Sequence, residues 1–107
     1  MRDITYEELE EIINKEDKVF VDFWGEACRP CEAIKPILEK ISSDEKFRYI
    51  KFLSLNITLF PEAGAIYGIF SVPTLIIFIK GKEVDRKIGY ITQGELERFL
   101  LNWKEEK

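Results

Sequence analysis

The amino-acid sequence predicts an α/β protein in which a central mixed β-sheet lies between two layers of helices. Short apolar runs rich in β-branched and aromatic residues alternate with segments whose apolar residues recur at helical spacing. The last two strand-like runs flank a tight turn at Gly81, which indicates an antiparallel hairpin beside parallel strand pairs. With 107 residues, 46% of them hydrophobic, the chain has the size and the core of one domain over residues 1–107.

The first half of the chain predicts helix, strand, helix and strand in turn. Thr5 and Glu8 have the spacing of a capping box, which starts a helix. The apolar run at 18–24 is short and β-branched, as expected for a strand buried on both faces, and Pro36 is expected to kink the following helix. The expected elements are a helix over about 5–14, a strand over 18–24, a helix from the cysteine pair to about 42–43, and a strand over 47–56.

The second half predicts a short helix, a hairpin and a final helix. Pro61 suits the first turn of a helix and Gly68 its end. Thr92 and Glu95 form a second capping-box pattern. The expected elements are a helix over 61–67, strands over 75–79 and 83–88, and a helix that starts at 92. Since strand–helix–strand order favours parallel pairing by right-handed crossover, helices must cover both faces of the sheet.

Composition argues against several classes of function. The net charge is −4 and the two signs are interspersed, so the surface offers no basic stripe for nucleic acid. The start of the chain carries no apolar signal-peptide region, and the longest apolar run, 72–79, is too short to span a bilayer. We therefore expect a cytoplasmic protein with no membrane partner. The charged run 104–107 is expected to be a solvated helix end.

The chemistry of the chain centres on its two cysteines, in the order Cys28-Arg29-Pro30-Cys31. Cys28 follows a predicted strand and falls at or near the N-cap of the next helix, where the partial positive charge and the free N–H groups favour a thiolate. Arg29 adds a cation next to it. Cys31 lies about one turn further into the helix and should be buried and neutral. An exposed thiolate beside a buried thiol is the arrangement that disulfide exchange requires.

Other interpretations of the pair are a zinc site and two core cysteines. A zinc site needs four ligands, and this chain has no third cysteine and no histidine, so we expect no metal. Cysteine also fills protein cores readily, and a chance pair in the core stays an alternative.

The residues around the pair resemble the active-site stretch of the thioredoxin family. The resemblance extends without gaps over essentially the whole chain and predicts the thioredoxin fold. Its motifs are the stretch 21–31, Pro36, residues 67–69, residues 72–74, Gly81 and Gly89.

The resemblance implies a protein-disulfide reductase. In that family's pattern Cys28 attacks a substrate disulfide, and Cys31 resolves the mixed disulfide. Asp22 resembles the buried acid that takes the proton of Cys31. Burial in so apolar a strand should raise the pKa of its carboxyl, although an Asp at a solvated strand end is the alternative. Pro73 resembles the cis-proline that faces the cysteines.

The resemblance also implies how substrates and electrons reach the pair. The expected substrates are protein disulfides, and the expected electron donor is an NADPH-linked flavin reductase. No cofactor is expected besides the redox-active disulfide, and the chain is expected to be a monomer. The expected substrate-binding residues are Trp24, Arg29, Pro30, Val72, Pro73 and Gly89.

Departures from the family pattern leave the details open. Ala27 replaces the usual tryptophan. Arg29 replaces the usual glycine, which favours a more oxidising disulfide, although Glu26 and Glu32 oppose it. Ser54 replaces a lysine near the buried acid, which leaves Asp22 harder to ionise.

Three apolar residues lie in the segments that flank the expected groove, namely Leu59, Phe60 and Phe70. This apolar set is either part of the core or an enlarged docking surface for a partner or a second copy of the chain.

Alternative functions are a glutaredoxin-like or disulfide-isomerase-like enzyme and a non-catalytic binding module.

Overall fold

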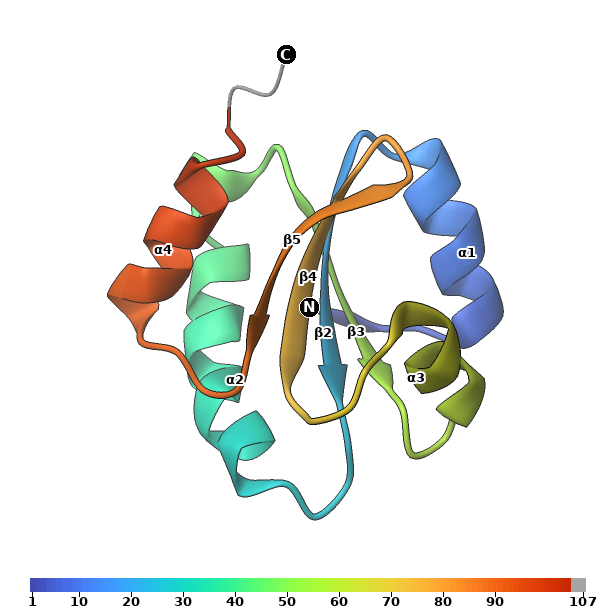
Figure 1. Cartoon of the computed structure of the whole chain (residues 1–107). Helices are drawn as coiled ribbons and strands as arrows, with labels where there is room; N and C mark the ends of the chain where they lie inside the picture. The colour runs from blue at the N-terminus through green and yellow to red at the C-terminus, as the bar shows by residue number, and fades with distance from the viewer. Residues whose placement is uncertain (105–107) are drawn as a thin grey trace.

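The computed structural model describes residues 1–104 and shows a five-stranded sheet between two pairs of helices (Figure 1). The strand order is β1-β3-β2-β4-β5. The strands are β1 (Arg2–Asp3), β2 (Lys18–Trp24), β3 (Lys51–Asn56), β4 (Thr74–Ile79) and β5 (Lys82–Ile88). The helices are α1 (Tyr6–Lys15), α2 (Arg29–Ser42), α3 (Pro61–Tyr67) and α4 (Gln93–Leu101), with a short 3₁₀ helix, η1 (Glu45–Phe47). The predicted α/β three-layer architecture is confirmed.

The mixed pairing of the sheet is also as predicted. Strand β2 runs parallel to β3 and antiparallel to β4, and β4 and β5 form an antiparallel hairpin. At the hairpin turn Lys80 and Gly81 both have positive φ, of 51° and 83°. Two successive residues with positive φ match the right-handed twist of the flanking strands.

The two faces of the sheet have separate cores, because neighbouring strand residues point to opposite faces. In β2, Phe20 packs with residues of α2 and α4, whereas Val21 packs with residues of α1 and α3. Figure 1 shows α2 and α4 on one side of the sheet and α1 and α3 on the other. Asp22 lies two residues after Phe20 and therefore on the face that α2 covers.

Local capping signals place the helix ends where the sequence predicts them. Thr5 and Thr92 each accept a hydrogen bond from the backbone N–H three residues later, and both capping boxes are complete. Gly68 ends α3 in the left-handed conformation, with φ of 65°. Pro36 lies inside α2 as expected.

Two segments differ from the sequence-based prediction. Residues 47–50 are not part of a strand, because Asp44 caps η1 and β3 begins at Lys51. The edge strand β1 was not expected, since two residues carry no periodicity; its place follows from parallel pairing with β3. The predicted helix end at 104–107 lies, apart from Lys104, outside the described residues, and Lys104 is in a turn after α4.

Candidate active site

The cysteine pair lies where β2 passes into α2, at the lower edge of the sheet in Figure 1. Cys28 is the N-cap of α2, and its Sγ accepts a hydrogen bond from the Cys31 backbone N–H at 3.2 Å. The two cysteines form a disulfide, with their Cα atoms 5.3 Å apart. Cys28 is partly exposed, whereas Cys31 is only 6% exposed. The predicted N-cap position and the difference in burial are both confirmed.

The approach to Cys28 is lined from the loop between α3 and β4. The Val72–Pro73 peptide bond is cis, and the Val72 carbonyl oxygen lies 3.7 Å from Cys28 Sγ. Pro73 is buried, and its carbonyl oxygen accepts a hydrogen bond from the Gly89 N–H at 2.7 Å. The structure thus brings Val72, Pro73 and Gly89 together with the pair, although 61 residues of sequence separate Cys28 from Gly89.

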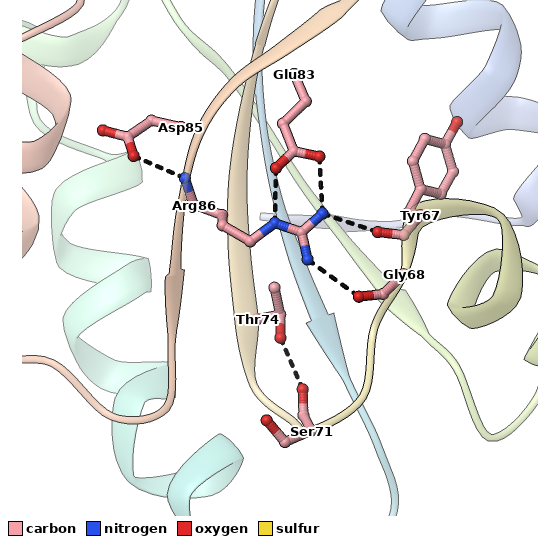
Figure 2. A network of polar contacts seen from close by, with 7 residues as sticks. All are labelled: Tyr67, Gly68, Ser71, Thr74, Glu83, Asp85 and Arg86. Carbon is pink, nitrogen blue, oxygen red and sulfur yellow. Dashed lines mark hydrogen bonds and ion pairs between the residues drawn. The ribbon is translucent and has the colours of Figure 1, made fainter.

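An arginine network that the sequence analysis missed anchors this loop to the sheet (Figure 2). Arg86 in β5 donates to the backbone carbonyls of Tyr67 and Gly68, at 2.8 and 3.1 Å. The same guanidinium makes a two-pronged ion pair with Glu83, at 2.6 and 2.7 Å. Both carbonyls lie at the C-terminal end of α3, where helix carbonyls lack partners. The network holds the end of α3 and the start of the Pro73 loop against the hairpin.

The remaining predicted binding residues lie close to the pair along the chain. Arg29 and Pro30 are exposed at the first turn of α2, and Trp24 is partly buried at the end of β2. Ala27, directly before Cys28, is exposed and has a φ of 55°, in the left-handed region. A residue with a Cβ pays about 1 kcal/mol for this conformation, so the loop into Cys28 is held by its surroundings.

Asp22 is buried beneath the pair, and the alternative of a solvated strand end is wrong. It is 6% exposed, and among residues 1–104 its Oδ1 has no hydrogen-bond partner. Burial raises the pKa of Asp22 from 3.8 to about 7, with a further rise from the negative charge of Asp3. Lys35 on α2 acts in the opposite direction.

A cavity of about 500 Å³ joins Asp22 to Cys31, and Lys35, Asp3 and Ser54 also line it. Ser54 stands directly opposite Asp22 in the β2–β3 register. The cation near the acid therefore comes from α2 rather than from β3. Sequence reasoning missed Lys35 and Asp3, because neither lies near Asp22 along the chain and only the packing of α2 and β1 brings them there.

The apolar set divides between surface and core. Leu59 is 65% exposed and Phe70 97% exposed, so the core interpretation is wrong for both. Phe60 is partly buried and packs against the core on the α1 and α3 face, as that interpretation expects.

Two other kinds of feature are absent from residues 1–104. That part of the chain brings no three Cys, Asp or Glu side chains together in a way that could hold a metal ion. Nor does it contain a helix of the length and hydropathy needed to cross a membrane.

Comparison with known proteins gives one consistent family. A family model described as thioredoxin matches residues 1–102. Thioredoxin from Rickettsia bellii is 39% identical over 93 residues, which cover 87% of this chain and 88% of that protein. Thioredoxin from Porphyra purpurea is 40% identical over 91 residues, which cover 85% of this chain and 84% of that protein.

Solved structures agree with this match. A structure of Plasmodium falciparum thioredoxin superposes with a TM-score of 0.88 at 25% identity, covering 96% of this chain and 99% of that one. Fasciola hepatica thioredoxin superposes with a TM-score of 0.86 at 31% identity, covering 97% of this chain and 100% of that one. With a Cys-Arg-Pro-Cys disulfide at the N-terminus of α2, this chain belongs to the thioredoxin family and is a thiol–disulfide oxidoreductase of protein disulfides.

Proposed function

We propose that Cys28 is the attacking thiol, Cys31 the resolving thiol and Asp22 the proton acceptor in the reduction of protein disulfides. The observation that carries this assignment is the position of Cys28 as the N-cap of α2, partly exposed, with the buried Cys31 one turn behind it. An N-cap sulfur receives backbone N–H groups and the positive end of the helix dipole. These interactions favour a thiolate at Cys28, which is the reactive form.

The reaction then proceeds in two exchanges. The Cys28 thiolate attacks one sulfur of the substrate disulfide, a new S–S bond forms, and the other substrate sulfur leaves as a thiolate. Cys31 gives its proton to Asp22 and attacks Cys28 Sγ. The mixed disulfide breaks, the second substrate sulfur leaves, and the Cys28–Cys31 disulfide forms. Two electrons pass from the cysteine pair to the substrate disulfide, and Asp22 holds the proton that Cys31 gives up.

Asp22 suits the role of base because burial holds its pKa at about 7. A carboxyl of ordinary pKa would be too weak a base to deprotonate a thiol near neutral pH. The cavity lined by Asp22 and Cys31 gives the proton a path between them. Replacing the acid by the isosteric amide, Asp22→Asn, should slow release from the mixed disulfide and leave the first attack unchanged.

The substrate enters beside the cis-proline loop. The Val72 carbonyl oxygen lies 3.7 Å from Cys28 Sγ, and Arg29 and Pro30, which follow Cys28 in the chain, are exposed. A disulfide-bearing segment that reaches Cys28 would therefore meet both the cis-proline loop and the first turn of α2. Trp24 and Gly89 complete the surface at the ends of β2 and β5.

The same proposal includes the location of the protein, its oligomeric state and its electron donor. A cytoplasmic monomer would carry electrons from an NADPH-linked flavin reductase to protein disulfides and so maintain the thiol balance of the cell. A disulfide-isomerase-like role is the second candidate, and it is favoured by Arg29. An exposed cation next to Cys28 stabilises the thiolate and makes the disulfide more oxidising.

The test is reduction of a generic protein disulfide, followed by the turbidity of the reduced product. The wild-type protein should turn over in the presence of a small dithiol. Cys31→Ser should stop after one attack, as a mixed disulfide with Cys28 whose mass is that of both chains. Cys28→Ser, as the matched control, should form no such adduct. Turnover by Cys31→Ser at the wild-type rate would contradict the assignment.

A further inference from the structure

Asp3, Ser54 and Asp22 form a row across three neighbouring strands. The register pairs Asp3 with Ser54 between β1 and β3, and Ser54 with Asp22 between β3 and β2. Registered residues of parallel strands point to the same face, and neighbouring strands lie about 4.8 Å apart. All three side chains line the cavity that also reaches Cys31. The edge strand β1 therefore brings a second carboxylate into line with the buried acid.

The hydroxyl in the middle of this row is committed to Asp3. Ser54 Oγ donates a short hydrogen bond to Asp3 Oδ1. Since a serine hydroxyl has one proton to donate, Ser54 has only lone pairs left to offer any other group in the row. The Oδ1 of Asp22 accordingly lacks a donor within the described chain. A protonated Asp22 can donate to such lone pairs, whereas an ionised Asp22 finds no donor in the row.

The other charged groups around the Asp22 cavity belong to α2, to the loop after β2 and to the N-terminus. On α2, Lys35 opposes the rise in the pKa of Asp22, and Glu32 and Cys31 line the same cavity. Two further carboxylates of the cavity have partners of their own: Glu39 with the Met1 amino group at 3.1 Å, and Glu26 with the Asn56 amide at 3.2 Å. On β4 the registered neighbour of Asp22 is the uncharged Leu75.

We propose that Asp3 is a positioning residue for the proton step at Asp22, acting both by its charge and by holding the Ser54 hydroxyl. The proposal rests on the proposed role of Asp22 as base. The charge of Asp3 adds to the effect of burial and helps to keep Asp22 protonated until the pH approaches neutrality, so that the carboxylate that forms is a base strong enough for Cys31. The strand that sequence reasoning missed thereby tunes the resolving step.

The direct test is the titration of Asp22 in the oxidised protein, where no thiol titrates with it, followed by the carboxyl ¹³C shift in NMR. For Asp3→Asn we expect the proton-binding constant of Asp22 to fall about threefold to tenfold, the size of one charge at this spacing. Asp3→Glu should restore the wild-type value. Lys35→Gln should shift it in the opposite direction. Glu16→Gln, an exposed change of equal charge, should leave it within about 1.5-fold.

Ser54→Ala separates the two parts of the mechanism. If the hydroxyl carries part of the effect, Asp3→Asn should shift the Asp22 constant at least twofold less in the Ser54→Ala background than alone. Equal shifts in both backgrounds would overturn the role of Ser54. A shift below 1.5-fold for Asp3→Asn alone, in a protein whose amide spectrum retains β1, would overturn the proposal as a whole. If that spectrum shows β1 lost in Asp3→Asn, the other two variants decide. A shift of the Asp22 constant above 1.5-fold in Asp3→Glu, or no shift in Lys35→Gln, would overturn the proposal too.

The rate of release from the mixed disulfide distinguishes this proposal from the role of Asp22 itself. Measured against pH, the midpoint of release should move to lower pH in Asp3→Asn by the same factor as the titration. If Asp3→Asn shifts the titration of Asp22 but not the pH profile of release, Asp22 is not the base, although Asp3 still influences the proton affinity of Asp22. If Asp22→Asn slows release but Asp3→Asn changes neither the Asp22 titration nor the pH profile of release, Asp22 is the base and the proposed role of Asp3 is wrong.

Discussion

The burial of Asp22 predicts a stability that depends on pH in a defined way. The pKa of this carboxyl rises from 3.8 to about 7 on folding, chiefly because burial disfavours the charge. A raised pKa means that the folded chain holds the proton more tightly than the unfolded chain. Its contribution is therefore fully favourable below pH 3.8 and is lost as the pH rises to about 7. With about 1.4 kcal/mol per pKa unit, the ionised acid costs the folded state about 4 kcal/mol above that range.

Asp22→Asn removes this cost and keeps the shape of the side chain. The amide stays buried, so part of the gain is offset by its own polar atoms. We expect the free energy of unfolding of the variant, relative to wild type, to increase by about 2–4 kcal/mol between pH 4 and pH 8. Most of that change should fall below pH 7, where the acid is ionised in the unfolded wild-type chain but still holds its proton in the folded one.

The assay is urea unfolding of both oxidised proteins across this pH range, with the free energy taken by linear extrapolation. Asp17→Asn is the matched control, because it removes an exposed carboxylate. Its difference from wild type should stay constant within about 0.5 kcal/mol. If the Asp22→Asn difference is equally flat from pH 4 to pH 8, Asp22 ionises in the folded chain as easily as in the unfolded one. The assignment of this acid as a neutral-pH base would then fail.

Three further predictions concern the surroundings of the site. Arg86→Lys should lower the free energy of unfolding by about 1–2 kcal/mol, because a lysine cannot bind Glu83 and two carbonyls together; chemical denaturation measures it, and an unchanged midpoint would show that the network contributes nothing. Thr92→Ala should cost about 1 kcal/mol through the lost cap of α4, seen as a lower melting temperature, whereas Thr92→Ser should restore it. Arg29→Gly should lower the redox potential measured against a glutathione buffer, and an equal or higher potential would reject a role for this charge.

Sequence reasoning succeeds here where structure is set by neighbours along the chain. The capping boxes at Thr5 and Thr92, the hairpin turn at Gly81 and the N-cap position of Cys28 depend on a few adjacent residues, and all are found in the structure. Asp22 was predicted to be buried from the apolar run around it, and it is.

Sequence-based prediction fails where contacts between distant segments of the chain determine the local structure. Strand β1 exists because Arg2 and Asp3 pair with β3, and so short a segment has no pattern of its own. Residues 47–50 are apolar and aromatic enough for a strand, yet the side chain of Asp44 caps a 3₁₀ turn instead. The charges that act on Asp22 belong to β1 and α2, so the absence of a lysine at position 54 could not reveal them. Arg86 likewise meets its carbonyl partners 18 and 19 residues away.

The central claim is that the helix N-terminus ionises one sulfur of the reduced pair while the other stays buried and neutral. Alkylation of the reduced protein by a small haloacetamide over a range of pH, read by mass spectrometry of peptides, tests it most directly. We expect a single adduct on Cys28, formed at a rate that is half-maximal well below the pH of about 8.5 at which a free cysteine ionises. Equal labelling of Cys31, or a half-maximum for Cys28 at or above that pH, would contradict it.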